Sequence, residues 1–164
     1  MRKKVGLYLG ITAFLVAGLY VLFCVSYKAK VYGAFLKKAE CFEEQKQSGY
    51  PEYKDFTASV WVTDSWFGTR GNISLTQTRY LAEDVEGNDY VVNNTIDIIA
   101  FPKVFGGYKI RVLVSPGNGE KGVGFYIDEG LQLLEDDPDI GKIYEKHFDE
   151  IQKRVDLLIE VFGL

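Results

Sequence analysis

The stretch VGLYLGITAFLVAGLYVLFCVSY, residues 5–27, contains no charged side chain and decides how the chain is organised. As a helix rising about 1.5 Å per residue it would be roughly 34 Å long, enough to cross a hydrocarbon core of about 30 Å. A helix also satisfies its own backbone hydrogen bonds inside lipid. Basic residues flank the stretch at positions 2–4 and at Lys28 and Lys30. The sequence therefore predicts a single-pass protein of the cell membrane, with a basic leader and transmembrane anchor over residues 1–27.

A cleaved signal peptide is the alternative interpretation of this stretch. Signal peptides have an apolar core of about 7–15 residues and a cleavage site with small residues at alternate positions. The apolar run is longer than that, and cleavage after Ala29 would place Tyr27 where a small residue is needed. The pair Cys24 and Ser26 fits the cleavage pattern only weakly. We therefore expect the anchor to be retained.

Charge is divided unevenly along the chain. Residues 1–50 carry 8 Lys and Arg against 3 Glu, whereas residues 51–164 carry 11 Lys and Arg against 20 acidic residues, so the net charges are +5 and −9. A domain with a charge of −9 repels phosphate backbones, so no nucleic-acid partner is expected. The basic residues that follow the anchor suit anionic lipid headgroups instead; they are Lys28, Lys30, Lys37 and Lys38.

The side of the membrane on which the domain lies is weakly indicated. Three basic residues precede the apolar run and four follow within about 15 residues, so the positive-inside rule gives almost no bias. The short basic leader is typical of a signal anchor, and strands rich in Ser, Thr and Tyr suit an exported domain. We expect the domain outside the cytoplasm. The two cysteines of the chain, Cys24 and Cys41, precede the strands and cannot form a disulfide framework for them.

An amphipathic helix is predicted over residues 28–49. Its apolar side chains recur at helical spacings of three, four and three residues, at Tyr32, Phe35, Ala39 and Phe42. We expect this helix to continue the membrane helix. Gly49 is placed to end it, because glycine accepts the left-handed conformation that follows many helices.

The middle of the chain alternates between apolar and polar residues with a period of two, which is typical of β-strands. Strands are predicted over residues 56–63, 72–81, 90–101, 108–115 and 123–128. Glycine-containing turns connect them, and short connections join antiparallel neighbours. A five-stranded antiparallel meander is therefore expected.

The C-terminal segment is predicted to be a helix with Asp137 as its N-cap and Pro138 in its first turn. Its apolar residues form one stripe: Ile140, Tyr144, Phe148, Ile151, Val155, Leu158 and Phe162. The apolar face of the sheet supplies the surface that this stripe needs. The fold class is α+β, with residues 50–164 forming a soluble domain in which the C-terminal helix packs on one face of the sheet.

The sequence contains no complete catalytic or cofactor-binding motif, and neither a cofactor nor a metal ion is expected. Gly117, Gly119 and Gly122 have the spacing of a dinucleotide fingerprint, but a predicted strand follows where a helix is required. His147 is the only histidine, so no metal site or triad can rely on a second one. A small hydrolase that uses scattered carboxylates, such as Asp64, Asp97 and Asp128, is the least favoured hypothesis.

Several aromatic residues lie outside the predicted apolar face. Trp61 and Tyr126 are on the polar faces of their strands, and Trp66 and Phe67 are in a turn. Exposed aromatic residues mark protein-binding surfaces. Alternatively, the helix over residues 28–49 covers this second face of the sheet and makes them part of the core. The second arrangement is favoured, because that helix needs a surface on which to dock.

Small residues form one face of the predicted membrane helix, at Gly6, Gly10, Ala13 and Ala17. Small side chains let two membrane helices approach closely, so this face is a candidate for homo-oligomerisation through the anchor. With no catalytic motif in view, the favoured function is a membrane-anchored, non-enzymatic interaction or accessory domain, such as a subunit of an envelope complex.

A long N-terminal helix that is apolar over half its length and leads into an antiparallel sheet resembles the layout of type IV pilins. The resemblance implies a subunit of an envelope filament or secretion apparatus. A pilin-type leader ends in Gly before an aromatic residue, with a Glu a few residues into the apolar run. Here Gly10 and Ile11 lie inside the run, and the first acidic residue is Glu40.

Overall fold

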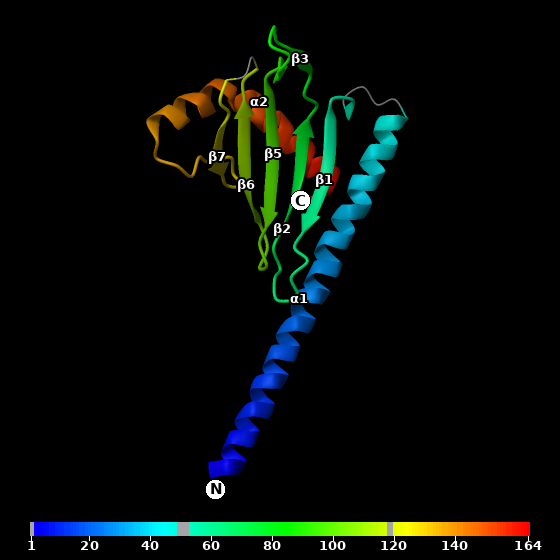
Figure 1. The fold of residues 1–164 in the computed structure, drawn as a ribbon, viewed down its shortest axis with the longest axis vertical. Coiled ribbons are helices and arrows are strands. Elements are labelled where there is room, and N and C mark those ends of the chain that lie inside the picture. Colours follow the sequence, from blue (N-terminus) through cyan, green and yellow to red (C-terminus); the bar gives the residue numbers. More distant parts are fainter. Residues whose placement is uncertain (1, 49–52, 118–119) are drawn as a thin grey trace.

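The computed structural model describes residues 2–48, 53–117 and 120–164, the side chains of residues 2–7 excepted. A long helix leads into a sheet domain that a second helix completes (Figure 1). In chain order the elements are α1 (Arg2–Gln47), β1 (Phe56–Val62), β2 (Gly71–Gln77), β3 (Leu81–Glu83), β4 (Asp89–Val91), β5 (Thr95–Pro102), β6 (Tyr108–Ser115), β7 (Val123–Ile127) and α2 (Pro138–Phe162). The predicted α+β class, with an antiparallel sheet and a C-terminal helix, is confirmed.

The helix α1 is continuous for 46 residues, so the amphipathic helix continues the apolar one as predicted. Its N-terminal part stands clear of the domain, and every side chain from Tyr8 to Tyr20 is exposed (Figure 1). Among the described residues, α1 is the single helix that is long and apolar enough to cross a membrane, by length and composition. The helix end predicted at Gly49 lies outside the described residues.

The main sheet has five strands in the order β1-β2-β5-β6-β7, all antiparallel, which is the predicted meander. The prediction was wrong where it extended two strands over residues 72–81 and 90–101. The structure divides each of them, and β3 pairs with β4 as a separate two-stranded ribbon.

Polar side chains explain why the two long strands are interrupted. The Asp97 carboxylate accepts hydrogen bonds from the Gln77 backbone N–H and from Arg79, both at 2.9 Å. The Asn93 side chain accepts from the Tyr80 backbone N–H at 2.8 Å and donates to the Thr78 carbonyl at 3.0 Å. These side chains bond backbone groups that strand pairing would otherwise satisfy. Strand β2 therefore ends before this point and β5 begins after it, and β3 and β4 form their own ribbon.

The inner face of the sheet carries the core, and α2 crosses it (Figure 1). Four residues of the predicted helix stripe are essentially inaccessible to solvent: Ile151, Val155, Leu158 and Phe162. The other three, Ile140, Tyr144 and Phe148, are only partly buried. The helix begins as predicted, because the Asp137 side chain accepts a hydrogen bond from the Asp139 N–H at 2.9 Å.

A charged residue that the apolar stripe did not predict lies in this core. Arg154 is 6% exposed and donates a hydrogen bond to the Ile96 carbonyl at 3.2 Å. Its guanidinium also pairs with Glu150 and lies 5.1 Å from the centre of the Phe56 ring. A buried cation is tolerated where partners of this kind compensate for lost hydration.

The C-terminal half of α1 packs on the same face of the sheet as α2, beside β1. Phe35 contacts Phe162 of α2 with ring centres 5.9 Å apart, and Lys38 donates to the Phe162 carbonyl at 2.7 Å. The expectation that this helix covers the second face of the sheet was therefore wrong. One apolar face serves both helices, because α2 leaves the β1 side of that face open.

Tyr32 is a buried residue of α1 that lies against the sheet. Its side chain is 1% exposed, and burial raises the pKa of its hydroxyl to about 12, with Tyr27 adding to the shift. A Cβ atom on Gly71 would lie 2.7 Å from the Tyr32 ring and 2.6 Å from the Trp61 carbonyl oxygen. Only glycine leaves room for this packing.

Candidate interaction surface

The outer face of the sheet is the face that neither α1 nor α2 covers. Strand register places one residue from each strand in a row across it, in the order Ser59, Ser74, Ile99, Arg111 and Tyr126. The Ser59 and Ser74 hydroxyls are hydrogen-bonded at 2.7 Å, so this part of the row is fixed. The row mixes hydroxyl, aliphatic, cationic and aromatic groups.

Trp61 lies on the outer face near the end of β1 and is 57% exposed. It borders a hollow of about 510 Å³ whose lining also includes Arg70, Phe101 and Lys103. The hollow therefore lies between an exposed indole and two basic side chains. Tryptophan contributes strongly to binding when a partner buries it, because its large ring carries much apolar area.

Tyr126 lies on the same face, in the edge strand β7. The Lys109 ammonium is 3.8 Å from the centre of its ring, and the Arg111 guanidinium is 5.9 Å from it. Both cations lie close enough to interact with the π-system. The tyrosine is half-buried, and its backbone N–H donates to the Glu135 carboxylate. Edge strand β7 is thus held by a loop carboxylate while its aromatic ring stays on the outer face.

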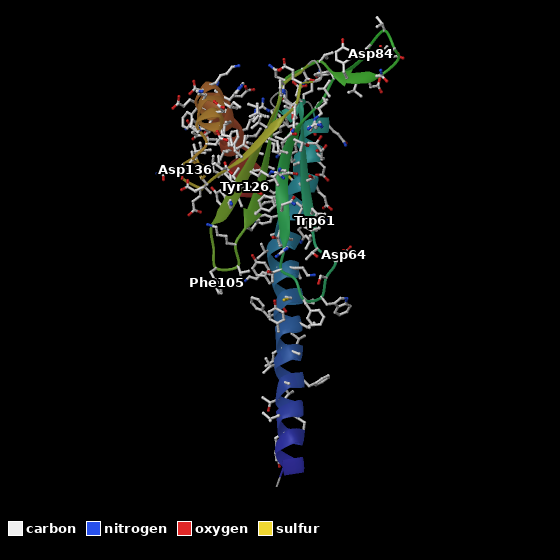
Figure 2. All side chains as sticks on the ribbon, turned by 60° about the vertical axis from the view of Figure 1, so that its left-hand side comes forward. Trp61, Asp64, Asp84, Phe105, Tyr126 and Asp136 are labelled. Carbon is white, nitrogen blue, oxygen red and sulfur yellow. The ribbon has the colours of Figure 1, made fainter. Side chains whose placement is uncertain are left out.

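Trp66 and Phe67 belong to a different surface. They are 68% and 63% exposed and lie in the loop after β1. That loop, which also contains Asp64, is at the end of the sheet nearest the free part of α1 (Figure 2). The structure therefore divides the four predicted binding residues into two pairs, with Trp61 and Tyr126 on the outer face. Tyr80 lies beyond the opposite end of β2, where its hydroxyl donates to Asp55 at 3.0 Å, and this bond raises its pKa.

Phe105 was not among the predicted binding residues, and it is completely exposed in the β5–β6 turn. The turn was predicted from its two glycines, and both Gly106 and Gly107 have positive φ angles. A large apolar residue directly before two turn glycines was the sequence signal that could have identified Phe105 as exposed. Figure 2 shows Phe105 at the same end of the domain as the loop that contains Asp64.

The basic residues after the apolar run divide between internal and exposed roles. The Lys28 ammonium donates to the carbonyls of Thr63 and Ser65, at 3.0 and 2.8 Å. Lys38 donates to the last turn of α2, which complements the negative end of the helix dipole. Lys30 and Lys37 are exposed. Within the described residues, Lys30 and Lys37 are the two of these four lysines that donate no such hydrogen bond to the domain.

The three carboxylates of the hydrolase hypothesis do not converge. Asp64 is exposed in the β1–β2 loop, whereas Asp97 is 3% exposed and bonded near the opposite end of β2. Asp128 follows β7, four strands from β1, and accepts from the Gly130 and Gln132 N–H groups. Within the described residues, no group of three His, Cys, Asp or Glu side chains could hold a metal ion.

The small-residue face of α1 is open to the surroundings over its described part. Ala13 and Ala17 are exposed, and a Cβ atom on Gly10 would meet nothing within 4 Å. Gly6 lies among the residues whose side chains are not described. At 100° per residue this face points within roughly 20° of the direction of Cys24, on the side of α1 that carries the domain.

No family model matches the chain, and comparisons with curated proteins and with solved structures return no significant match. Functional inference therefore rests on the surfaces described above.

Proposed function

We propose that the protein is a membrane-anchored, non-enzymatic interaction domain, in which α1 crosses the membrane and the outer face of the sheet binds a partner protein. One observation carries the proposal. Both helices pack on the inner face, and the face left uncovered holds Trp61 at 57% exposure. An exposed tryptophan contributes most to the binding free energy when a partner protein buries it.

The composition of the outer face supports a protein partner. Tryptophan, tyrosine and arginine are the residues most enriched at interface hot spots, and Trp61, Tyr126 and Arg111 share this face. Strand pairing fixes their relative positions, so little backbone ordering is needed on binding. The positive charge of Lys109 and Arg111 favours an acidic or aromatic patch on the partner.

Site-specific photo-crosslinking in native membranes tests this proposal. A photoreactive amino acid at Thr57, which is exposed on the same face of β1 as Trp61, is expected to capture one defined protein. Adding Trp61→Ala should abolish that adduct at an unchanged level of the protein. The same probe at Lys153, exposed on α2, is the control and should capture nothing comparable. Equal adducts from both positions, or an adduct indifferent to Trp61→Ala, would contradict the proposal.

We further propose that the domain lies outside the cytoplasm, on the basis of the short basic leader and the composition of the strands. Cys41 is exposed and Cys24 is fully buried, so one thiol is available to report the orientation. A membrane-impermeant maleimide is expected to label Cys41 in intact cells. Labelling that requires cell lysis would place the domain in the cytoplasm.

A pilin-like subunit is the second candidate, and the continuous α1 with a sheet on its C-terminal half is the observation that favours it. A pilin-like subunit would be recovered in envelope filaments visible by electron microscopy. Recovery only as dispersed membrane protein would leave the interaction domain as the proposed function.

We expect any self-association to run through the small-residue face of α1. Gly10→Ile would fill the groove between the small side chains and weaken helix pairing by about 1–2 kcal/mol. Leu19→Ile is the matched control, because Leu19 is exposed on nearly the opposite side of the helix. A reporter of association in the membrane should fall for Gly10→Ile alone. Equal signals for both variants would show that the small residues have no part in association.

A further inference from the structure

We propose that the end of the domain nearest the free part of α1 inserts aromatic side chains into the membrane interface. This edge consists of Trp66 and Phe67 in the β1–β2 loop and Val104 and Phe105 in the β5–β6 loop. Their side chains are 68%, 63%, 36% and 101% exposed. The inference rests on the proposed membrane anchorage of α1 and adds a second contact between the protein and the bilayer.

The depth of the β1–β2 loop follows from its contact with α1. The Tyr20 hydroxyl donates to the Phe67 carbonyl at 3.2 Å. Tyr20 lies seven residues before the end of the apolar run, about 10 Å along the helix. A hydrocarbon core of about 30 Å that begins at Val5 would end near Cys24. Trp66 and Phe67 therefore lie beside the last turns of the span, at the level where tryptophan and tyrosine gather in membrane proteins.

Three carbonyls of this loop accept hydrogen bonds from side chains of α1, which matters for a loop at the membrane boundary. Lys28 donates to the carbonyls of Thr63 and Ser65, and Tyr20 donates to the carbonyl of Phe67. The Phe67 N–H donates to the Ser65 hydroxyl at 3.3 Å. Water would satisfy these carbonyls on an ordinary surface loop, whereas lipid would not. Here two side chains of the anchor helix replace water.

The β5–β6 loop lies at the same end of the domain as the β1–β2 loop. The Tyr27 hydroxyl donates to the Lys103 carbonyl at 3.3 Å, which fixes this loop to the end of the apolar run. Phe105 lies at its tip, and Figure 2 shows it at the same end as the β1–β2 loop. Arg70 and Lys103 are exposed beside the aromatic residues, where cations suit anionic headgroups.

Trp61 provides an internal reference above the membrane. A Cβ atom on Gly71 would meet both the Trp61 carbonyl oxygen and the Tyr32 ring, so the backbone of Trp61 lies near Tyr32. Tyr32 follows Tyr20 by twelve residues, about 18 Å along α1. The chain has two tryptophans, so Trp66 is placed at the interface and Trp61 lies farther from the membrane, on the far side of the hollow that Val104 and Lys103 border.

Tryptophan fluorescence of the full chain in lipid vesicles tests the inference. Trp61→Phe leaves Trp66 as the only reporter, and Trp66→Phe leaves Trp61. Each variant is reconstituted in ordinary vesicles and in vesicles of lipid brominated near the headgroup end of the acyl chain. Emission from Trp66 should fall roughly twofold or more in the brominated lipid, because the indole lies at interfacial depth. Emission from Trp61 should be nearly the same in both lipids.

Flotation of the same vesicles after alkaline extraction separates the two claims. Protein that floats and shows no greater quenching of Trp66 than of Trp61 would overturn the insertion of the loop edge while leaving the anchor in place. Protein that does not float would overturn both the anchorage and the insertion that depends on it.

Discussion

Replacing Ile151 by Asp is expected to abolish the cooperative fold of the sheet domain. Ile151 is 0% exposed on the face of α2 that packs against the sheet. A carboxylate there loses its hydration without gaining a partner, at a cost of several kcal/mol against a typical stability of about 5–15 kcal/mol. Thermal unfolding of the detergent-solubilised protein, followed by circular dichroism, should show a melting temperature far below that of the wild type.

The neighbouring residue provides the control for this substitution. Gln152 is exposed, so Gln152→Asp introduces the same carboxylate on the solvent side of the same helix turn. Its effect should stay within about 0.5 kcal/mol, as is usual for surface substitutions. If the melting temperature of the Ile151→Asp variant is within a few degrees of that of Gln152→Asp, the result would contradict the packing of α2 on the inner face.

Gly71→Ala is expected to displace α1 from the sheet. The new Cβ atom would lie 2.7 Å from the Tyr32 ring and 2.6 Å from the Trp61 carbonyl oxygen, and the second of these is backbone that cannot rotate away. Overpacking of this kind costs about 1–3 kcal/mol. In a Cys41→Ser background, Cys24 is the only thiol, and it is fully buried in the docked helix. We expect Gly71→Ala to lower the unfolding free energy and to speed modification of Cys24.

Gly33→Ala is the matched control, because Gly33 is next to Tyr32 in sequence but a Cβ atom there meets nothing within 4 Å. Alanine also favours a helix over glycine by up to about 1 kcal/mol. The control should therefore be neutral or stabilising, with slow modification of Cys24. Equal stability of the two variants would show that Tyr32 does not set the approach of α1.

The elements of the fold were largely predictable from periodicity. Alternation between Phe56 and Val62 and between Tyr108 and Ser115 located those strands, and Asp137 located the start of α2. The ribbon β3-β4 was missed because alternation continues through residues whose backbone groups are bonded by the side chains of Asp97 and Asn93. Those bonds join residues about 13 to 20 positions apart, as Tyr80–Asn93 and Gln77–Asp97, which a local pattern does not contain.

The arrangement of the helices on the sheet was less predictable. Periodicity shows that Tyr32, Phe35 and Phe42 share a face, but it does not show which face of the sheet receives them. The choice depends on how much of the inner face α2 leaves open and on contacts such as Phe35 with Phe162. For the same reason, the sequence identified Trp61 and Trp66 as candidates without showing that they belong to two separate surfaces.

Partner binding by the outer face and membrane contact by the loop edge both require that α1 stays attached to the domain. The contacts of Tyr20 and Lys28 with the β1–β2 loop, and the complete burial of Cys24 between them, join the end of the apolar run to the sheet. Removal of the run by cleavage near residue 26 would delete Tyr20 and Cys24 from this contact. Both proposed surfaces therefore depend on retention of the helix.

Mass spectrometry of the intact protein extracted from membranes tests whether the helix is retained. We expect the mass of the full 18.6 kDa chain, beginning at Met1 or at Arg2 after removal of the initiator methionine. A mature chain that begins after residue 26 would contradict the retained anchor, and with it the membrane-bound arrangement of the domain.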